Sequence, residues 1–531
     1  MNLPLPDRRQ WLCQAARLAG TAAGAWWLPR SVLGAPRWDN NPFALGGASG
    51  SPTPNAVVLW TRLLQPEGDG LSRMGTQTIA VRWELAHDEG FTRIVQSGQS
   101  LATPALGHSV HVEVAGLQSD RWYHYRFMVG DAVSATGRTR TFPAPGAKVS
   151  KLRMAYASCQ HWEHGYYSAY RHMRDEQLDA VMFLGDYIYE YGGSSKAVRP
   201  APARNAITLD DYRSFYALYK SDPDLQAMHA ACPWLMTWDD HEVHNDYAGL
   251  QAGVFGPEVI NFAERRAAAY QAYYEHMPLR SSVLTRALAG LAQGSELRLY
   301  GAVPYGKLAT LYLLDNRQYR APQVCTKDGA RGSSTVNPAH CPEWRNPQRT
   351  LLGQAQEQWL DTAFAKNGAR WNVLGQQTVF GQRDFQSGRG QTLSNDGWDG
   401  YSAARTRVTD SMQRHHLANP VLLGGDVHAN WVGHVKADYA RASSATLGVE
   451  FCGTSITSHG GSNARIAEQL ERNPHFVLAD RERRGYGVVE FTHQQLTTTL
   501  RVVDDVVQPD SGFSTLAQFV VEAGQPRLQR V

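Results

Sequence analysis

The chain has 531 residues, more than one ordinary hydrophobic core accommodates, so about two or three domains are expected. Its formal net charge is +3 and 19% of its residues are charged, which excludes a surface dedicated to nucleic acid or another polyanion. Beyond the N-terminal segment, no uninterrupted apolar run approaches the ~20 residues that a helix needs to cross a bilayer. We therefore expect no stable membrane span.

Residues 1–35 have the features of an export signal. The paired arginines Arg8 and Arg9 precede a mildly apolar stretch, Leu18–Leu28, and small residues follow near Gly34. This order predicts a twin-arginine signal, the twin-arginine (Tat) export machinery as a partner, and a periplasmic or secreted location. The alternative is an amphipathic N-terminal helix.

Residues 38–146 have the pattern of an antiparallel β-sandwich. Short runs of alternating apolar and polar residues are separated by Gly, Ser, Pro and Asp, and they begin at Ala56, Ile79, His108 and Trp122. Alternation with a period of two over about 100 residues is typical of an immunoglobulin-like or fibronectin-like sandwich. No catalytic constellation is visible in it. The segment Pro143–Gly146 is the predicted linker to a second domain.

The predicted catalytic domain, residues 150–531, opens with a strand, a helix and a strand. Met154–Ala157 is a short apolar run, Gly165–Glu176 has helical spacing, and Asp179–Leu184 is continuously apolar. Uninterrupted apolar strands are typical of a sheet that helices cover on both faces. This pattern predicts an α/β fold whose ligand site lies at the carboxyl ends of the strands.

Side chains that can bind a metal follow the predicted strands of this domain. They are Cys159, Asp186, Tyr189, Asp239, Asp240, Asn245, Asp426 and His428. Taken singly, each has an ordinary explanation as a buried thiol, a turn carboxylate or a core histidine. Several carboxylates at one rim would repel each other unless cations neutralised them, so their convergence predicts a metal site. Whether Asp239 or Asp240 is the direct ligand stays open.

The ligand types constrain the metals and the chemistry. Thiolate, phenolate and imidazole favour a redox-capable or borderline-soft transition ion, whereas the surplus carboxylates and Asn245 favour hard cations. A phosphate ester bound there would be attacked in line by a metal-activated hydroxide. His241 is a candidate acid for the leaving group, or alternatively a strut of the ligand loop. Arg317 is a candidate phosphate clamp, or alternatively a structural arginine.

The motifs SCQ, GDYIYE, TWDDHEV, GGDVHANW and FCGTSIT occur in this order between Ser158 and Thr457. In these motifs the chain resembles the PhoD-type alkaline phosphatases, which have a calcineurin-like metallophosphoesterase core. The resemblance implies an α+β sandwich of two mixed sheets flanked by helices, preceded by the all-β sandwich domain. The chain departs from the commoner metallophosphoesterase pattern, because Ser158-Cys159-Gln160 stands in place of an Asp-x-His motif.

The resemblance also implies the identity of the metals. Ferric iron (Fe³⁺) would be held by Cys159, Asp186, Tyr189 and His428. Calcium (Ca²⁺) would share Asp186 and be held further by Asp239 or Asp240, Asn245 and Asp426. We therefore expect an exported, metal-dependent phosphoric ester hydrolase that acts on a small phosphate ester. The alternatives are a phosphodiesterase or phospholipase D-like hydrolase with the same site, and a calcium-dependent binding protein without activity.

The remaining cysteines indicate whether the protein folds in an oxidising compartment. Cys325 and Cys341 close a short Gly- and Ser-containing segment, which fits a disulfide formed in an oxidising compartment. Cys232 and Cys452 could pair with each other or stay as buried thiols.

Overall fold

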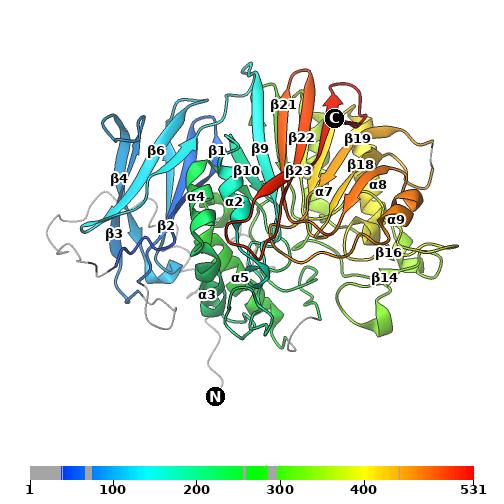
Figure 1. Cartoon of the computed structure of the whole chain (residues 1–531), viewed down its shortest axis with the longest axis horizontal. Coiled ribbons are helices and arrows are strands. Elements are labelled where there is room, and N and C mark those ends of the chain that lie inside the picture. Colours follow the sequence, from blue (N-terminus) through cyan, green and yellow to red (C-terminus); the bar gives the residue numbers. More distant parts are fainter. Residues whose placement is uncertain are drawn as a thin grey trace.

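The computed structural model describes residue 38 and residues 40–65, 74–254, 259–284, 296–366, 368–441 and 443–531. The predicted export signal, residues 1–35, lies outside the described residues. Within the described part, strands form two large sheets that pack face to face, and helices cover their outer faces (Figure 1). The predicted fold class, two mixed sheets flanked by helices and preceded by an all-β region, is confirmed.

The first large sheet runs in the order β24-β23-β22-β21-β9-β10-β11-β1-β2-β5. Its strands are β1 Gly47–Thr53, β2 Ala56–Arg62, β5 Ser109–Ala115, β9 Lys151–Ala157, β10 Ala180–Phe183, β11 Trp234–Met236, β21 Gly485–Thr492, β22 Gln495–Val503, β23 Phe513–Glu522 and β24 Gln529–Arg530. Strands β9, β10 and β11 are parallel, and Phe183 of β10 pairs with Ala157 on one side and Met236 on the other. The loops that follow these three residues therefore leave the sheet at the same edge.

The second large sheet runs in the order β12-β13-β15-β17-β19-β18-β20. Its strands are β12 Gly301–Tyr305, β13 Ala309–Leu313, β15 Trp371–Gly375, β17 Pro420–Gly424, β18 Asn430–Lys436, β19 Thr446–Cys452 and β20 Phe476–Asp480. Strands β13, β15, β17 and β19 are parallel. Residues 297–300 are not part of this sheet: the Leu297 carbonyl accepts a hydrogen bond from the Gln318 side chain (2.7 Å), and β12 begins at Gly301.

The N-terminal strands form a sandwich that shares a sheet with the rest of the chain. Its smaller sheet contains β3 Ile79–Ala86, β4 Ile94–Ala102, β6 Trp122–Val129, β7 Ala132–Val133 and β8 Gly137–Arg140. Its other sheet is β1, β2 and β5, and β1 continues into β11 through the pair Gly50 and Trp234. Gly50 permits this approach, because a Cβ there would lie 2.7 Å from the Trp234 carbonyl oxygen. The domain boundary near residue 146 falls between β8 and β9 and stays a prediction.

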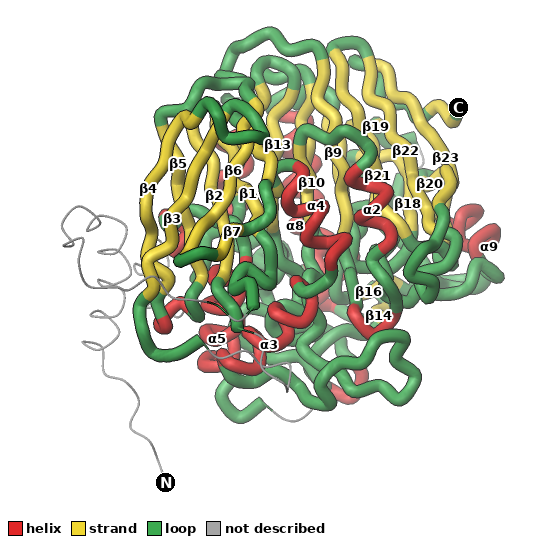
Figure 2. The backbone as a smooth tube through the Cα atoms, turned by 60° about the vertical axis from the view of Figure 1, so that its left-hand side comes forward, coloured by secondary structure: helices red, strands yellow, loops and turns green. Residues whose placement is uncertain are grey.

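The helices complete the layers. They are α2 Ser168–Arg174, α3 Leu209–Lys220, α4 Pro223–Ala231, α5 Phe262–His276, α7 Gln354–Ala365, α8 Ser402–Arg414 and α9 Ile466–Arg472. Helices α2 to α5 cover the first large sheet, and α7 and α8 cover the second. Helix α3 begins at a capping box, in which the side chains of Thr208 and Asp211 each accept a hydrogen bond from the other residue's backbone N–H. In Figure 2 most strands lie side by side in the upper part of the view, and loops together with α3 and α5 lie below them.

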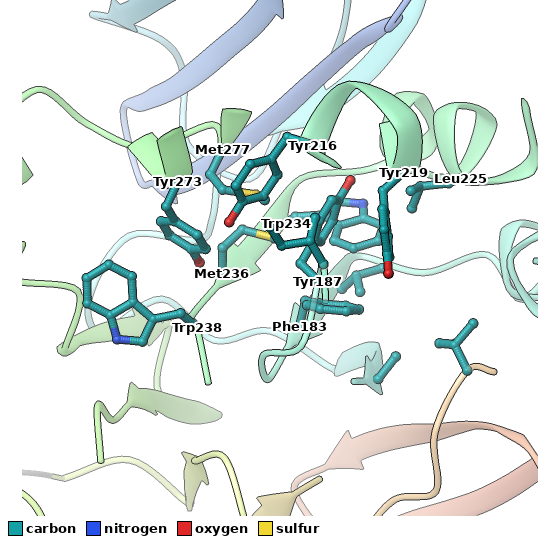
Figure 3. Packing of buried hydrophobic residues seen from close by; sticks show 14 of the residues in the cluster. Phe183, Tyr187, Tyr216, Tyr219, Leu225, Trp234, Met236, Trp238, Tyr273 and Met277 are labelled. Atoms are coloured by element: carbon teal, nitrogen blue, oxygen red, sulfur yellow. The ribbon is translucent and has the colours of Figure 1, made fainter. Parts of the chain in front are cut away.

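The side chains of strand β10 point alternately to the two faces of the first large sheet, so they belong to two different parts of the hydrophobic core. Val181 and Phe183 face the helical layer, whereas Ala180 and Met182 face the second sheet. The helical side is rich in aromatic residues, and Figure 3 shows Phe183 among the rings beside Trp234. A sheet buried on both faces fixes the strand register strongly, because a slip by one residue would exchange the two faces. The strand ends are thereby held in place.

The disulfide prediction is confirmed and the open question about the other cysteines is answered. Cys325 and Cys341 are joined, and Cys232 and Cys452 are separate buried thiols. The bridged segment carries β14 Thr335–Val336, which pairs with β16 Leu393–Ser394.

Among the described residues, no helix is both long and apolar enough to cross a membrane.

Candidate metal centre

The predicted ligands converge where the two large sheets meet. Cys159 and Asp186 follow β9 and β10 of the first sheet, and Asp426 follows β17 of the second. Three groups of side chains each bring their ligand atoms within 4.8 Å of one another. The groups are Cys159, Asp186 and His428; Asp186, Asp240 and His241; and Asp239, Asp240 and Asp426. Asp186 belongs to two of them, in agreement with a shared position between two metals.

The backbone at these strand ends is unusual. Cys159, Asp186, Asp426 and His428 all have positive φ angles, of 59°, 56°, 66° and 51°. Non-glycine residues rarely adopt this left-handed conformation, and where they do it commonly marks a functional site. The strain is local, and the surrounding buried strands hold it.

One side of the centre is formed around the Tyr189 hydroxyl. This hydroxyl donates to Asp186 Oδ2 (2.9 Å) and lies 3.1 Å from His428 Nε2 and 2.7 Å from Ser458 Oγ. His428 Nδ1 donates to the carbonyl oxygen of His459 (2.9 Å), so the lone pair of a neutral ring is on Nε2. Burial lowers the pKa of His428 to about 3, which keeps the ring neutral. Tyr189 and His428 are therefore oriented as ligands.

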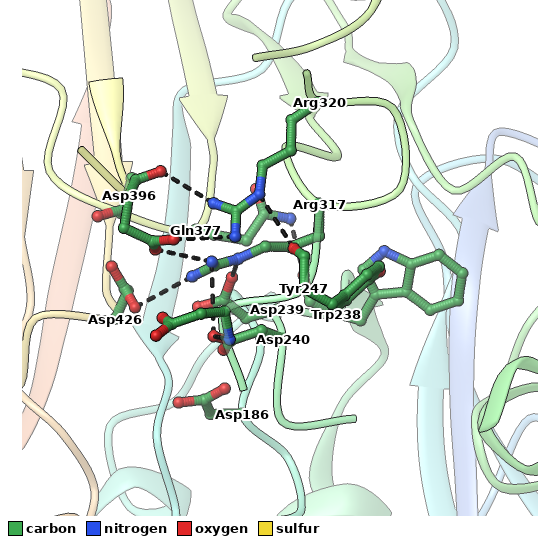
Figure 4. Close-up of polar contacts among 12 residues, drawn as sticks. Asp186, Trp238, Asp239, Asp240, Tyr247, Arg317, Arg320, Gln377, Asp396 and Asp426 are labelled. Atoms are coloured by element: carbon green, nitrogen blue, oxygen red, sulfur yellow. Dashed lines mark hydrogen bonds and ion pairs between the residues drawn. The ribbon is translucent and has the colours of Figure 1, made fainter. Parts of the chain in front are cut away.

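The other side is a cluster of aspartates around Arg317 (Figure 4). The guanidinium group is 1% exposed and contacts four carboxylates. Its Nη1 lies 2.8 Å from Asp396 and 3.5 Å from Asp240, its Nη2 lies 3.2 Å from Asp426, and its Nε donates to Asp239. One cation thus faces four anions, which leaves an excess of negative charge.

Two buried carboxylate oxygens without a hydrogen-bond partner indicate whether cations fit this arrangement. Asp186 Oδ1 and Asp239 Oδ2 are buried and have no hydrogen-bond partner among the described residues. Burial, with the neighbouring carboxylates, raises the pKa of both groups well above the usual range. Anionic carboxylates can persist here only beside further positive charge. The oxygen donors fit hard cations, and the Cys159 thiol and Tyr189 phenol fit a softer transition ion.

His241 is held beside the centre by a buried glutamate. Its Nδ1 donates to Glu190 Oε2 (2.7 Å), and the other oxygen of Glu190 accepts the backbone N–H of Asn245 (2.8 Å). Burial alone would lower the pKa of His241, but Glu190, Asp186 and Asp240 outweigh it and raise this pKa well above its usual value. Hydrogen bonding to Glu190 fixes the orientation of the His241 ring beside the candidate ligands. Asn245 is half-buried on the same loop, and its ligand role stays a prediction.

Several residues that complete the site were not predicted from the sequence. Glu242 accepts the backbone N–H groups of Tyr187 (2.6 Å) and Asp239 (2.8 Å), which ties two ligand loops together. Asp396 accepts from Arg317 and lies 2.9 Å from Arg320 Nη2. The available signals were weak: Glu242 belongs to a recognised motif, but Asp396 lies in a loop that had no assigned role.

Comparisons with known proteins agree with this geometry. The PhoD-like phosphatase family matches residues 154–500, and the N-terminal domain of PhoD-like phosphatases matches residues 29–143. Alkaline phosphatase D of Bacillus subtilis (strain 168) is 44% identical over 538 residues, covering 99% of this chain and 89% of that protein. A solved structure described as the structure of PhoD superposes with a TM-score of 0.87 at 45% identity, covering 94% of this chain and 93% of that one.

The chain belongs to the PhoD-like phosphatase family. It is a phosphoric ester hydrolase, as predicted, rather than a binding protein without activity. The resemblance drawn from the five motifs is confirmed.

Proposed function

We propose that this phosphatase works through a mixed metal centre at the seam of the two sheets. Its proposed ligands are Cys159, Asp186, Tyr189, Asp239, Asp240, Asn245, Asp426 and His428. The observation that carries the proposal is the sharing of Asp186 by two ligand groups while its Oδ1 has no protein partner. When bound, the cations would polarise the phosphoryl oxygens and supply hydroxide for in-line attack at phosphorus.

The proposed metals are ferric iron beside Cys159 and Tyr189, and calcium among the carboxylates. Thiolate and phenolate transfer electron density to ferric iron on absorbing visible light, so the active protein should be coloured, whereas zinc would leave it colourless. Elemental analysis and a visible spectrum test this. Tyr189→Phe should bleach or shift the band and Cys159→Ser should change it differently. A colourless, fully active enzyme with only zinc or calcium would refute the iron assignment and leave the phosphatase intact.

His241 is the proposed acid for the leaving group. Its Nδ1 donates to Glu190, which favours a charged ring with a second proton on Nε2, and the ring lies among ligand residues; this supports transfer of the Nε2 proton to the leaving group over a purely structural role. For Arg317 the contacts support the structural alternative more than the phosphate clamp, because its Nε and both terminal nitrogens already contact aspartates. Arg317 is proposed to hold the carboxylates apart and in register.

The substrate is proposed to be a small phosphate monoester. Turnover of 4-nitrophenyl phosphate and of its bis-ester, measured side by side on the same preparation, tests this. A much higher kcat/KM for the bis-ester would replace the monoester proposal with the phosphodiesterase alternative. Absence of turnover with both esters, with metals bound, would refute the proposed centre.

Export by the twin-arginine route is proposed from the sequence alone. Arg8 and Arg9 precede the weakly apolar stretch, and the disulfide between Cys325 and Cys341 is consistent with an oxidising compartment. Changing both arginines to Lys should retain the protein inside the cell. Normal accumulation of this double variant in the periplasm or medium would refute the export proposal.

A further inference from the structure

A buried histidine beside the metal centre has a proton that nothing in the described protein accepts. His161 follows Cys159 by two residues and its side chain is 1% exposed. Its Nδ1 accepts the backbone N–H of Glu163 (3.2 Å), where it caps a short 3-10 helix. Its Nε2 is buried and, among the described residues, has no hydrogen-bond partner.

The hydrogen bond at Nδ1 determines where the proton lies. Because this nitrogen accepts a bond, a neutral ring must carry its proton on Nε2. A buried N–H without an acceptor costs free energy, and native proteins rarely leave one unpaired. The capping role explains Nδ1 but leaves Nε2 unexplained. A group absent from the protein chain is therefore the expected acceptor.

The position of His161 is fixed from several sides. Its backbone N–H donates to Ser458 Oγ (3.2 Å), and its carbonyl accepts from Thr457 Oγ1 (2.8 Å). Its ring stacks on His164, with centroids 3.8 Å apart and planes at 11°. Ser458 also lies 2.7 Å from the Tyr189 hydroxyl. Ser458 therefore contacts both His161 and the proposed metal ligand Tyr189.

The ring of His161 lies against that ligand. Its centroid is 4.2 Å from the Tyr189 ring, and the His241 centroid is 4.1 Å from the same ring. Tyr191 lies beside both histidines, at 5.3 Å from His161 and 5.8 Å from His241. His161 and His241, the proposed acid, therefore both lie against the ring of Tyr189, the proposed iron ligand, beside the centre that would bind a phosphoryl group.

We propose that His161 Nε2–H donates a hydrogen bond to a non-bridging oxygen of the phosphoryl group. The inference rests on the proposed metal centre, since that centre supplies the position of the phosphate ester. An anionic oxygen is the strongest acceptor for such a donor. His161 is then a substrate-binding residue, separate from the ligands and from His241.

The chain offers a matched set of variants. In His161→Asn, the side-chain oxygen can still accept from the Glu163 N–H, because asparagine is a good capping residue, but the distal donor is lost. In His161→Gln, the longer amide can restore a donor near the Nε2 position. His164→Phe is the control for the ring stack, because it keeps an aromatic ring against His161; it also removes the acceptor of the His459 backbone N–H (3.1 Å), so its metal content is compared as well. Bound metals and the melting temperature are measured for all three.

Binding of inorganic phosphate to the metal-loaded proteins is the deciding measurement, by calorimetry. His161→Asn should bind phosphate about ten- to a hundred-fold more weakly with unchanged metal content, and KM for 4-nitrophenyl phosphate should rise. His161→Gln should recover part of this loss, and His164→Phe should stay within about threefold of the wild type.

Other outcomes separate this inference from the proposed function. Wild-type phosphate affinity and KM in His161→Asn would overturn the role of His161 and leave the metal centre standing. Loss of metal from His161→Asn would also overturn it, because the residue would then act on the centre itself. A wild-type protein that binds metal but neither binds phosphate nor hydrolyses the ester would overturn both.

Discussion

Replacing Arg317 with methionine should make the stability of the protein depend on bound cations. The substitution keeps a long side chain in a buried position and removes the positive charge. Four aspartates then face each other without the cation that Figure 4 shows between them. Cations bound to the same carboxylates would take over this neutralisation. The effect of the substitution should therefore be large without metal and small with it.

The magnitude follows from the contacts. At an effective dielectric constant of about 20, a unit-charge contact near 4 Å is worth about 4 kcal/mol before desolvation is counted. Arg317 makes four such contacts, and the cost of burying its own charge offsets part of them. Removing one partner of a single buried pair typically costs about 3–5 kcal/mol. For Arg317 we expect at least this loss in the free energy of unfolding in EDTA.

Urea unfolding in EDTA and with calcium and iron added measures the effect. Arg405→Met is the matched control, because Arg405 is also buried and pairs with one carboxylate, Asp399 (2.6 Å), which is not among the proposed ligands. The control should lose a similar amount of stability in both conditions. Arg317→Met should be much less stable than the wild type in EDTA and only slightly less stable than the wild type when calcium and iron are bound. Equal losses for Arg317→Met with and without metal would refute the reasoning.

Three further outcomes follow from the site and its surroundings. Asp186→Ala should lower kcat by at least about 100-fold and release metal, measured by elemental analysis, while circular dichroism stays unchanged; full metal content with more than a few per cent activity would contradict a shared ligand. Glu190→Gln should lower kcat about 100-fold with little change in KM, because His241 loses the carboxylate that orients it; an unchanged kcat would exclude that role. Cys341→Ser should cost about 3 kcal/mol of unfolding free energy under oxidising conditions and nothing under full reduction, measured by urea unfolding.

The sequence was most informative where strands lead directly into polar motifs. Asp179–Leu184 was predicted as a strand buried on both faces, and the structure has the buried strand β10 there. Because the parallel strands of one sheet end at a common edge, the side chains that follow β9, β10 and β11 were expected to lie together. This one topological rule carried most of the candidate site, since it requires no knowledge of side-chain contacts.

Contacts between distant loops could not be predicted in this way. Glu190 is 51 residues from His241, and no local pattern distinguishes a glutamate that orients a histidine from one that faces solvent. Asp396 meets Arg317 across 79 residues. The unpaired nitrogen of His161 likewise has no local signal, because a capping histidine looks the same whether its second nitrogen is used or not. These features depend on packing between loops, which a single sequence does not display.

The location of the centre ties metal binding to the assembly of the fold. Cys159 and Asp186 come from one sheet and Asp426 and His428 from the other, so neither sheet alone presents a complete set of ligands. The excess of buried negative charge opposes the packing of the two sheets until cations neutralise it. Binding of cations to the folded state therefore adds directly to the free energy of folding. A mixed set of soft and hard ligands is what this seam produces, because the proposed ligands come from several loops: Asp186 and Tyr189 lie on one, Asp239 and Asp240 on another, and Asp426 and His428 on a third.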